Sequence, residues 1–224
     1  MIKAFSVSLD KRKQYWAELK QQAITVGVDV TPFIVGDGTT LPPEMYNSID
    51  NPNPDLSGWG YGNKNFIVHH YNAFISHQKI IQIAKEQQLP CFLMLEDDAY
   101  ITNRYTHVFN KFIESFSNLE FDILYLGWWI GNETDEWNLK IENDFNKSKQ
   151  VQVMKATRLG GLHGAIINSS MYDYLLSLKP TDPIDCQLNQ IHNQIKSYVL
   201  LPKIIHVRSI YSYCEGGTLT RKYL

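Results

Sequence analysis

Three consecutive carboxylates follow an apolar run directly in "CFLMLEDDAYI", residues 91–101. Glu96, Asp97 and Asp98 repel one another, so a fold that places them at the end of a buried strand needs a cation nearby. Carboxylate oxygens are ligands that suit Mg²⁺ or Mn²⁺. In an extended segment residues i and i+2 point the same way, which predicts that Glu96 and Asp98 face one site and Asp97 another. The alternative is a solvated turn that caps a following helix.

The residues around the triplet predict alternating strands and helices, the first of them a strand, a helix and a strand that form a parallel unit. Expected strands cover 2–9, 28–35, 91–95, 121–127, 151–156, 161–168 and 198–207. Expected helices cover 11–26 with Asp10 as N-cap, 66–88, 103–117, 169–178 and 185–197. Two long irregular segments, 36–64 and 127–150, are interpreted as loops that face a substrate.

This alternation predicts a single α/β, Rossmann-like domain over 1–224, with a mixed, mostly parallel sheet and helices on both faces. The formal charge of -2 gives no general attraction to nucleic acid. Three scattered cysteines form no disulfide framework, and no stretch predicts a signal peptide or a transmembrane segment. We therefore expect a soluble cytoplasmic protein, with peripheral attachment to a membrane left open and the oligomeric state unknown.

Several candidate residues follow strands, where open sheets bind their ligands. The pairs Leu9-Asp10 and Gly36-Asp37 occupy such positions, as does the acidic triplet. An acid-x-acid pair of the phosphatase type stands near the N-terminus and begins with Asp, whereas here a whole strand-helix-strand unit comes first and the first acid is Glu96. The order instead fits GT-A glycosyltransferases, with a nucleotide-sugar half over about 1–101 and an acceptor half over about 102–224.

Five segments together resemble, in order and spacing, the family 25 glycosyltransferases, which include lipopolysaccharide-modifying and procollagen galactosyltransferases. The segments are "FSVSLDKRKQYW", "VTPFIVGDG", "FISHQKIIQIAKEQQLPCFLMLEDDAYI", "GGLHGAIINSSMYDYLL" and "PIDCQL". The most specific element is "LEDDA" with Ser76-His77 upstream of it. The chain departs from the pattern ahead of that pair, where His70, Asn72 and Ala73 replace the usual Glu, Gly and Cys.

The resemblance implies a metal-dependent inverting transfer of a hexose, galactose or glucose, from a nucleoside-diphosphate sugar to a glycan or protein hydroxyl. UDP is the usual nucleotide in related enzymes. Mn²⁺ or Mg²⁺ would be held by Asp98 with Glu96 and His206, and Asp185 would act as the base, with Asp182 as its substitute.

Further site residues follow from the same resemblance. Donor contacts are expected from Ser8, Leu9, Asp10, Arg12, Gly36, Asp37, His77, Glu96 and Asp97. Acceptor contacts are expected from Gly161, His163, Trp128 and Trp129. Two alternatives stay open: a relative of the same fold that binds sugar or nucleotide with reduced catalysis, and a metal-dependent phosphohydrolase.

Overall fold

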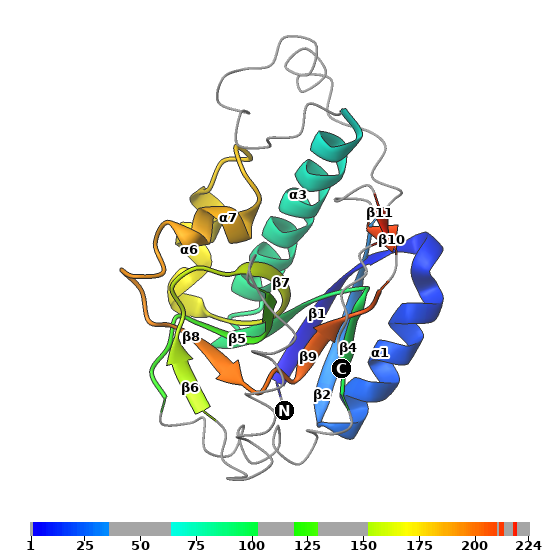
Figure 1. The fold of residues 1–224 in the computed structure, drawn as a ribbon, viewed down its shortest axis with the longest axis horizontal. Coiled ribbons are helices and arrows are strands. Elements are labelled where there is room, and N and C mark those ends of the chain that lie inside the picture. The colour runs from blue at the N-terminus through cyan, green and yellow to red at the C-terminus, as the bar shows by residue number, and fades with distance from the viewer. Residues whose placement is uncertain are drawn as a thin grey trace.

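A mixed sheet organises the computed structural model, which describes residues 2–35, 64–102, 119–129, 152–209, 211–212 and 217–218. Seven strands of these ranges pair in the order β2-β1-β3-β7-β5-β8-β6 (Figure 1). Their bounds are β1 Ile2–Leu9, β2 Val28–Val35, β3 Cys91–Glu96, β5 Ile123–Trp129, β6 Gln152–Lys155, β7 Gly160–Asn168 and β8 Ser197–Leu201. The fold class expected from the sequence, a mostly parallel α/β sheet, is confirmed.

The direction of the strands brings several strand ends to one edge of the sheet. β1 is parallel to both β2 and β3, and β5 is parallel to β8. β7 runs antiparallel between β3 and β5, and β6 runs antiparallel along β8. β1, β3 and β5 therefore end, and β7 begins, along one line, which we call the carboxyl edge.

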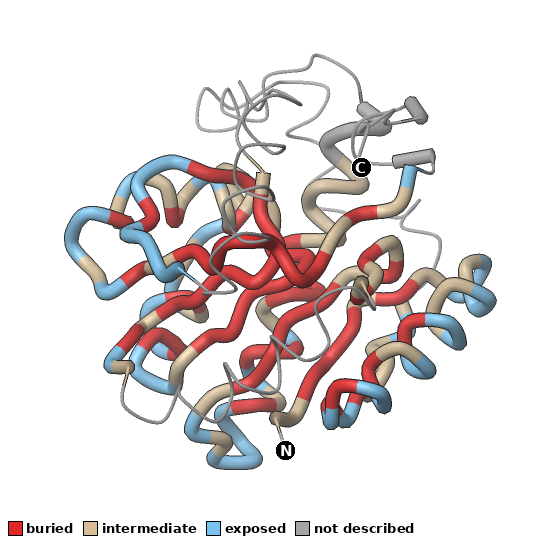
Figure 2. The backbone as a smooth tube through the Cα atoms, turned by 60° about the horizontal axis from the view of Figure 1, so that its bottom comes forward, coloured by how far each residue is buried: buried red, intermediate tan, exposed pale blue. Residues whose placement is uncertain are grey.

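Side chains of the central strands alternate between two hydrophobic clusters. In β3, Phe92 and Met94 pack on one side and Leu93 and Leu95 on the other, all with no exposed surface. A strand that is buried on both faces reads as a continuous apolar run, which is the pattern of "CFLML". Figure 2 shows this burial along the strands at the centre, with exposed residues on the outer sides of the helices.

Different elements cover the two faces (Figure 1). The helix α1 (Lys13–Thr25) and the ribbon of β4 (Ala99–Ile101) with β9 (Ile205–Val207) pack in one cluster, through residues such as Leu19 and Ile205. The other cluster contains α3 (Lys64–Glu86), α6 (Tyr172–Ser177) and α7 (Ile184–Asn189). The remaining elements are the 3-10 helices η1 (Asp10–Arg12) and η5 (Ser169–Met171) and the strands β10 (Tyr211–Ser212) and β11 (Gly217–Thr218).

Three local expectations were wrong. Asp10 does not cap the first helix: it begins η1, and its carboxylate lies 2.8 Å from Nζ of Lys13. The expected helix over 185–197 ends at Asn189, after which tight turns carry the chain to β8. The expected strand over 198–207 divides into β8, which pairs with β5 and β6, and β9, which pairs with β4. The helix expected over 103–117 lies outside the described residues.

A buried Tyr-His pair joins the turns after α7 to β5. The hydroxyl of Tyr125 lies 3.0 Å from Nε2 of His192, and both side chains are buried. Burial lowers the pKa of His192 below its ordinary value of 6.5. The ring is therefore neutral in the folded chain at pH values where an unfolded chain binds a proton.

We predict that this histidine makes the fold weaker in mild acid. As pH falls below about 6.5, the unfolded chain takes up a proton that folded His192 does not bind, so the free energy of unfolding decreases until the lowered folded pKa is reached. His192→Gln removes this step. Urea unfolding at pH 7.5, 6.5 and 5.5 should show a shallower decline for the variant than for the wild type; equal slopes would contradict the assignment.

Candidate functional site

The carboxyl edge gathers candidate residues from distant parts of the sequence. Parallel pairing sets Val7 opposite Glu96, so Leu9 extends beyond the end of β3. On the other side of β3, Leu95 pairs with Gly164, and Gly160 pairs with Trp129. The turn after β1, the acidic triplet and the Gly160-Gly161 pair therefore lie at the same edge.

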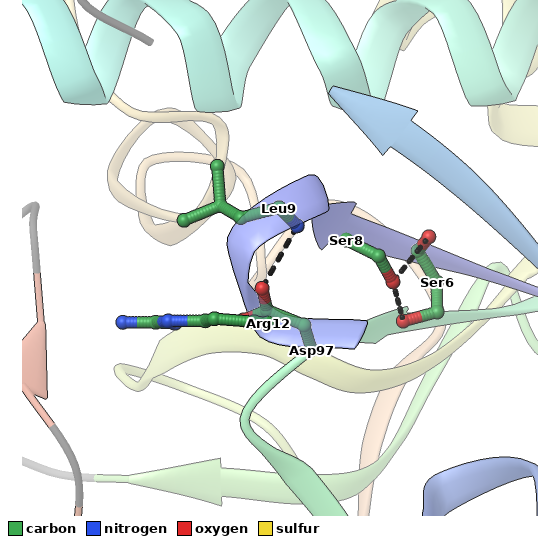
Figure 3. A network of polar contacts seen from close by, with 5 residues as sticks. All are labelled: Ser6, Ser8, Leu9, Arg12 and Asp97. Atoms are coloured by element: carbon green, nitrogen blue, oxygen red, sulfur yellow. Dashed lines mark hydrogen bonds and ion pairs between the residues drawn. The ribbon is translucent and has the colours of Figure 1, made fainter. Parts of the chain in front are cut away.

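Asp97 joins the turn after β1 to the acidic turn (Figure 3). Its Oδ2 accepts a hydrogen bond from the backbone N–H of Leu9 at 2.9 Å, and its Oδ1 accepts one from Nη1 of Arg12 at 2.8 Å. The residue is 5% exposed. Burial raises the pKa of Asp97, while Arg12 and the Leu9 amide act in the opposite direction. Arg12 thus binds a carboxylate of its own chain.

The expected alternation of the three acids holds only in part. β3 ends at Glu96, and Asp97 and Asp98 form a turn, so the two-residue period of a strand does not extend through the triplet. Asp97 faces the β1 turn, whereas Glu96 contacts His77 on α3.

Two other predicted donor contacts have internal partners. The hydroxyl of Ser8 is buried, donates to the carbonyl of Ser6 at 3.3 Å and lies 3.1 Å from the Ser6 hydroxyl. Ser8 therefore does not offer an open donor contact, which corrects the expectation; Figure 3 shows both serines. Asp10 is exposed and pairs with Lys13. Gly36 and Asp37 lie outside the described residues.

His77 and Glu96 meet across α3 and β3. Nε2 of His77 lies 3.4 Å from Oε1 of Glu96, and the side chain of His77 is 8% exposed whereas that of Glu96 is 36% exposed. The histidine predicted near the donor thus contacts the acidic triplet from the face covered by α3. Nε2 of His77 makes no hydrogen bond within the described structure, so this contact is a close approach and not a bond that fixes the carboxylate.

The β4–β9 ribbon brings His206 close to the acidic turn. His206 pairs with Tyr100, and the two rings stack with centroids 5.4 Å apart. Burial lowers the pKa of His206 to about 4, so the ring is neutral at pH 7. No three carboxylate, histidine or cysteine side chains of the described ranges form a group that could hold a metal ion. Glu96, Asp98 and His206 therefore do not make a ready three-ligand site.

A hydrogen bond joins Asp185 to Gly161, two residues that were expected in one site. Oδ2 of Asp185, in the first turn of α7, accepts the backbone N–H of Gly161 at 2.8 Å. One helical turn later Oδ1 of Asn189 accepts the N–H of Leu159 at 2.8 Å. Gly161 has φ of +88°, a conformation that favours glycine. Two side chains of α7 thus fix the segment that leads into β7.

The two tryptophans of this edge differ in exposure. Trp128 is 3% exposed, donates through Nε1 to the Leu200 carbonyl and has Nζ of Lys203 4.3 Å from its ring centroid. It belongs to the core, so the expectation of an acceptor-stacking surface is wrong for Trp128. Trp129, partly exposed, packs on Gly160, where an added Cβ would lie 2.5 Å from the ring.

Two candidates occupy less favourable positions. His163 is 3% exposed and packs against Gly161 and Gly127, where an added Cβ would lie within 2.5 and 2.9 Å of its ring. It lies behind the glycine turn, so direct contact with an acceptor is not available in this structure. Asp182 is partly exposed; burial raises its pKa, and its carbonyl accepts from Nε2 of Gln187.

Sequence reasoning missed two residues at this edge. Asn189 could have been found, because it stands four residues after Asp185 and therefore on the same side of a helix. Arg208 gave no local signal, since its position depends on the pairing of β9 with β4. Its backbone N–H donates to the carbonyl of Asp98 at 2.8 Å.

Comparisons with known proteins give distant structural likenesses. No family model and no curated protein matches the chain. A solved structure described as A197 from STIV has a TM-score of 0.44 at 10% identity and covers 95% of this chain and 87% of its own. A glycosyltransferase involved in the glycosylation of the major capsid of PBCV-1 has a TM-score of 0.38 at 11% identity, covering 87% and 68%. Neither establishes a family, so the resemblance to family 25 rests on the sequence motifs.

We predict that the Asp97 contact stabilises the fold far more than an exposed ion pair does. Asp97→Asn removes the charge opposite Arg12, whose side chain is largely buried, and should lower the free energy of unfolding by about 3 kcal/mol. Asp10→Asn, the matched control, breaks the exposed pair with Lys13 and should cost less than about 1 kcal/mol. Denaturant unfolding at pH 7 measures both free energies. Similar decreases for the two variants would contradict the prediction that the Asp97 contact stabilises the fold more than an exposed ion pair.

Proposed function

We propose that this protein is a metal-dependent, inverting glycosyltransferase that moves a hexose, galactose or glucose, from a nucleoside-diphosphate sugar, UDP-linked in the first instance, to a glycan or protein hydroxyl. The observation that supports it most is the convergence at the carboxyl edge. The acidic turn of Glu96 to Asp98 and the Asp185–Gly161 contact reach this edge from neighbouring strands. An inverting transferase needs a leaving-group site and a base near one sugar carbon.

The acidic turn is the proposed site of the donor diphosphate. Glu96 and Asp98 would hold Mn²⁺ or Mg²⁺ through carboxylate oxygens, and such an ion supplies neutralisation of the charge on the departing diphosphate. The described residues offer two carboxylates and no three-ligand group. That set suits an ion that takes its other ligands from phosphate oxygens and water.

Asp185 is the proposed base for the acceptor. The Gly161 amide holds one of its oxygens and so fixes the direction of the carboxylate. As the acceptor oxygen attacks the sugar carbon, its proton passes to Asp185, the bond from that carbon to the diphosphate oxygen breaks, and the configuration inverts. Trp129, beside Gly160, offers a partly exposed ring for a sugar face.

A binding protein without turnover is the second candidate. Arg12 pairs with Asp97, and Ser8 bonds to Ser6, so two predicted donor contacts are engaged inside the chain. Such a protein would bind a donor and release no nucleoside diphosphate.

Within the described ranges no helix has the length and apolar character to cross a membrane.

We predict that Asp98 is required for donor use. With Mn²⁺ and a panel of nucleotide sugars, the wild-type protein should show a donor-dependent rise in melting temperature and transfer to a glycan acceptor, and Asp98→Asn should abolish both. Asp173→Asn, which changes an exposed acid on α6, is the charge-matched control and should behave as wild type. A wild-type protein that is indifferent to every donor would contradict the proposal; donor binding without transfer would support the binding protein.

We predict a different effect for Asp185. Asp185→Asn keeps an oxygen that can accept the Gly161 N–H but cannot take up a proton, so donor affinity should be unchanged while turnover falls by on the order of 10²-fold or more. Single-turnover transfer measures the rate, and calorimetry measures donor affinity. Wild-type turnover in this variant would show that another residue is the base, and Asp182→Asn would then be the next variant to test.

A further inference from the structure

Arg208 lies beside the acidic turn, at the end of the β4–β9 ribbon. The pairing of Val207 with Ala99 places the Arg208 backbone N–H against the Asp98 carbonyl, at 2.8 Å. Its guanidinium carbon is 5.5 Å from the ring centroid of Tyr15 and 5.7 Å from that of Tyr100. The guanidinium therefore has aromatic rings from both α1 and β4 close to it.

One edge of this guanidinium has no acceptor in the described structure. Nη1 pairs with Oε2 of Glu18 at 2.7 Å. Nε and Nη2 are buried and make no hydrogen bond within the ranges that the structure describes. These two nitrogens form the side of the guanidinium that binds two oxygens of a phosphate or carboxylate at once. Because buried donors rarely stay unsatisfied, this edge indicates an absent anionic partner.

Two other cations near the carboxyl edge contact a carboxylate or an aromatic ring of the chain. Arg12 donates to Asp97 at 2.8 Å, and Nζ of Lys203 lies over the Trp128 ring. Within the described residues, Nε and Nη2 of Arg208 are buried without a hydrogen bond, whereas no buried nitrogen of Arg12 lacks one. The guanidinium lies near the ring of Tyr100, two residues after Asp98 in the sequence.

We propose that Arg208 is an oxyanion-binding residue whose Nε and Nη2 receive two oxygens of a phosphate group beside the acidic turn. Its side chain is 21% exposed, and because Nε and Nη2 are buried, binding requires the guanidinium to turn until this edge reaches the surface. The identification of that phosphate as part of a nucleotide-sugar diphosphate rests on the proposed function. Binding of a phosphate group as such requires no sugar transfer.

Calorimetry with inorganic pyrophosphate, with and without Mn²⁺, tests the proposal. Arg208→Lys keeps the charge and loses the paired N–H groups, so affinity should fall by on the order of tenfold or more. Lys3→Gln removes a charge at the opposite end of β1 and should leave affinity unchanged. Glu18→Gln removes the negative charge beside Nη1, keeps an oxygen that can accept its hydrogen bond, and should cause no loss of affinity. Wild-type affinity in Arg208→Lys, an equal loss in Glu18→Gln or no binding by the wild type would overturn the proposal.

Chemical modification of the folded wild type covers the case of an unstable variant. Pyrophosphate should slow the reaction of phenylglyoxal with Arg208 and leave exposed Arg158 unaffected, as measured by mass spectrometry. Equal reaction at Arg208 with and without pyrophosphate counts against the site. If pyrophosphate binds through Arg208 but no nucleotide sugar is used, the oxyanion site stands and the transferase proposal fails. If sugar transfer occurs and Arg208→Lys keeps wild-type pyrophosphate affinity, the transferase proposal stands and the oxyanion site fails.

Discussion

The buried contact of Asp97 with Leu9 and Arg12 is the constraint on which the carboxyl edge depends. β1 and β3 are parallel neighbours, but beyond their ends the chain continues into η1 after β1 and into β4 after β3. Asp97, in the turn after β3, bonds to Leu9 and Arg12 and so holds the two segments together beyond the end of the sheet. A buried carboxylate is tolerated only when it is paired and hydrogen-bonded, so the same contact also selects the geometry of both turns.

This contact changes the electrostatics of the acidic triplet. Three adjacent carboxylates repel one another, and Arg12 compensates the one in the middle. His77 approaches Glu96 from α3, and Arg208 reaches the Asp98 backbone from β9. Groups from three elements thus contact the triplet. A proposed metal ion would need to compensate Glu96 and Asp98 rather than all three acids, which is compatible with an ordinary divalent ion.

The sequence predicted the strands better than the side-chain directions. β1 and β2 agree with the expected ranges residue by residue, because runs of β-forming residues end at clear turn signals. Ser8 was assigned to a ligand surface because it stands at a strand end, and Trp128 because it was expected in the loop 127–150. The strand β5 instead extends to Trp129, and both Ser8 and Trp128 are buried. Which face of a strand meets another layer depends on the order of strands in the sheet, and the local sequence pattern does not determine that order.

Other contacts of the site depend on pairing between residues far apart in the sequence. Asp185 and Gly161 were predicted for one site, but the direct bond between them depends on α7 docking against the start of β7. Arg208 has no motif around it, and its relation to Asp98 exists because two short strands far apart in sequence pair with each other. Short strands of this kind carry little periodicity, so pattern reasoning cannot assign their partners.

Charge balance at the carboxyl edge links these observations to donor binding. Arg12 is matched by Asp97 and Nη1 of Arg208 by Glu18, so the formal charges of these two pairs cancel, while Glu96 and Asp98 add negative charge. A diphosphate would be repelled by those two acids. Its binding there should therefore depend on added positive charge, from a divalent ion against the carboxylates and from the remaining N–H groups of Arg208. If both contribute, pyrophosphate affinity should respond to Mn²⁺ even in Arg208→Lys, because the ion and the guanidinium act on different oxygens.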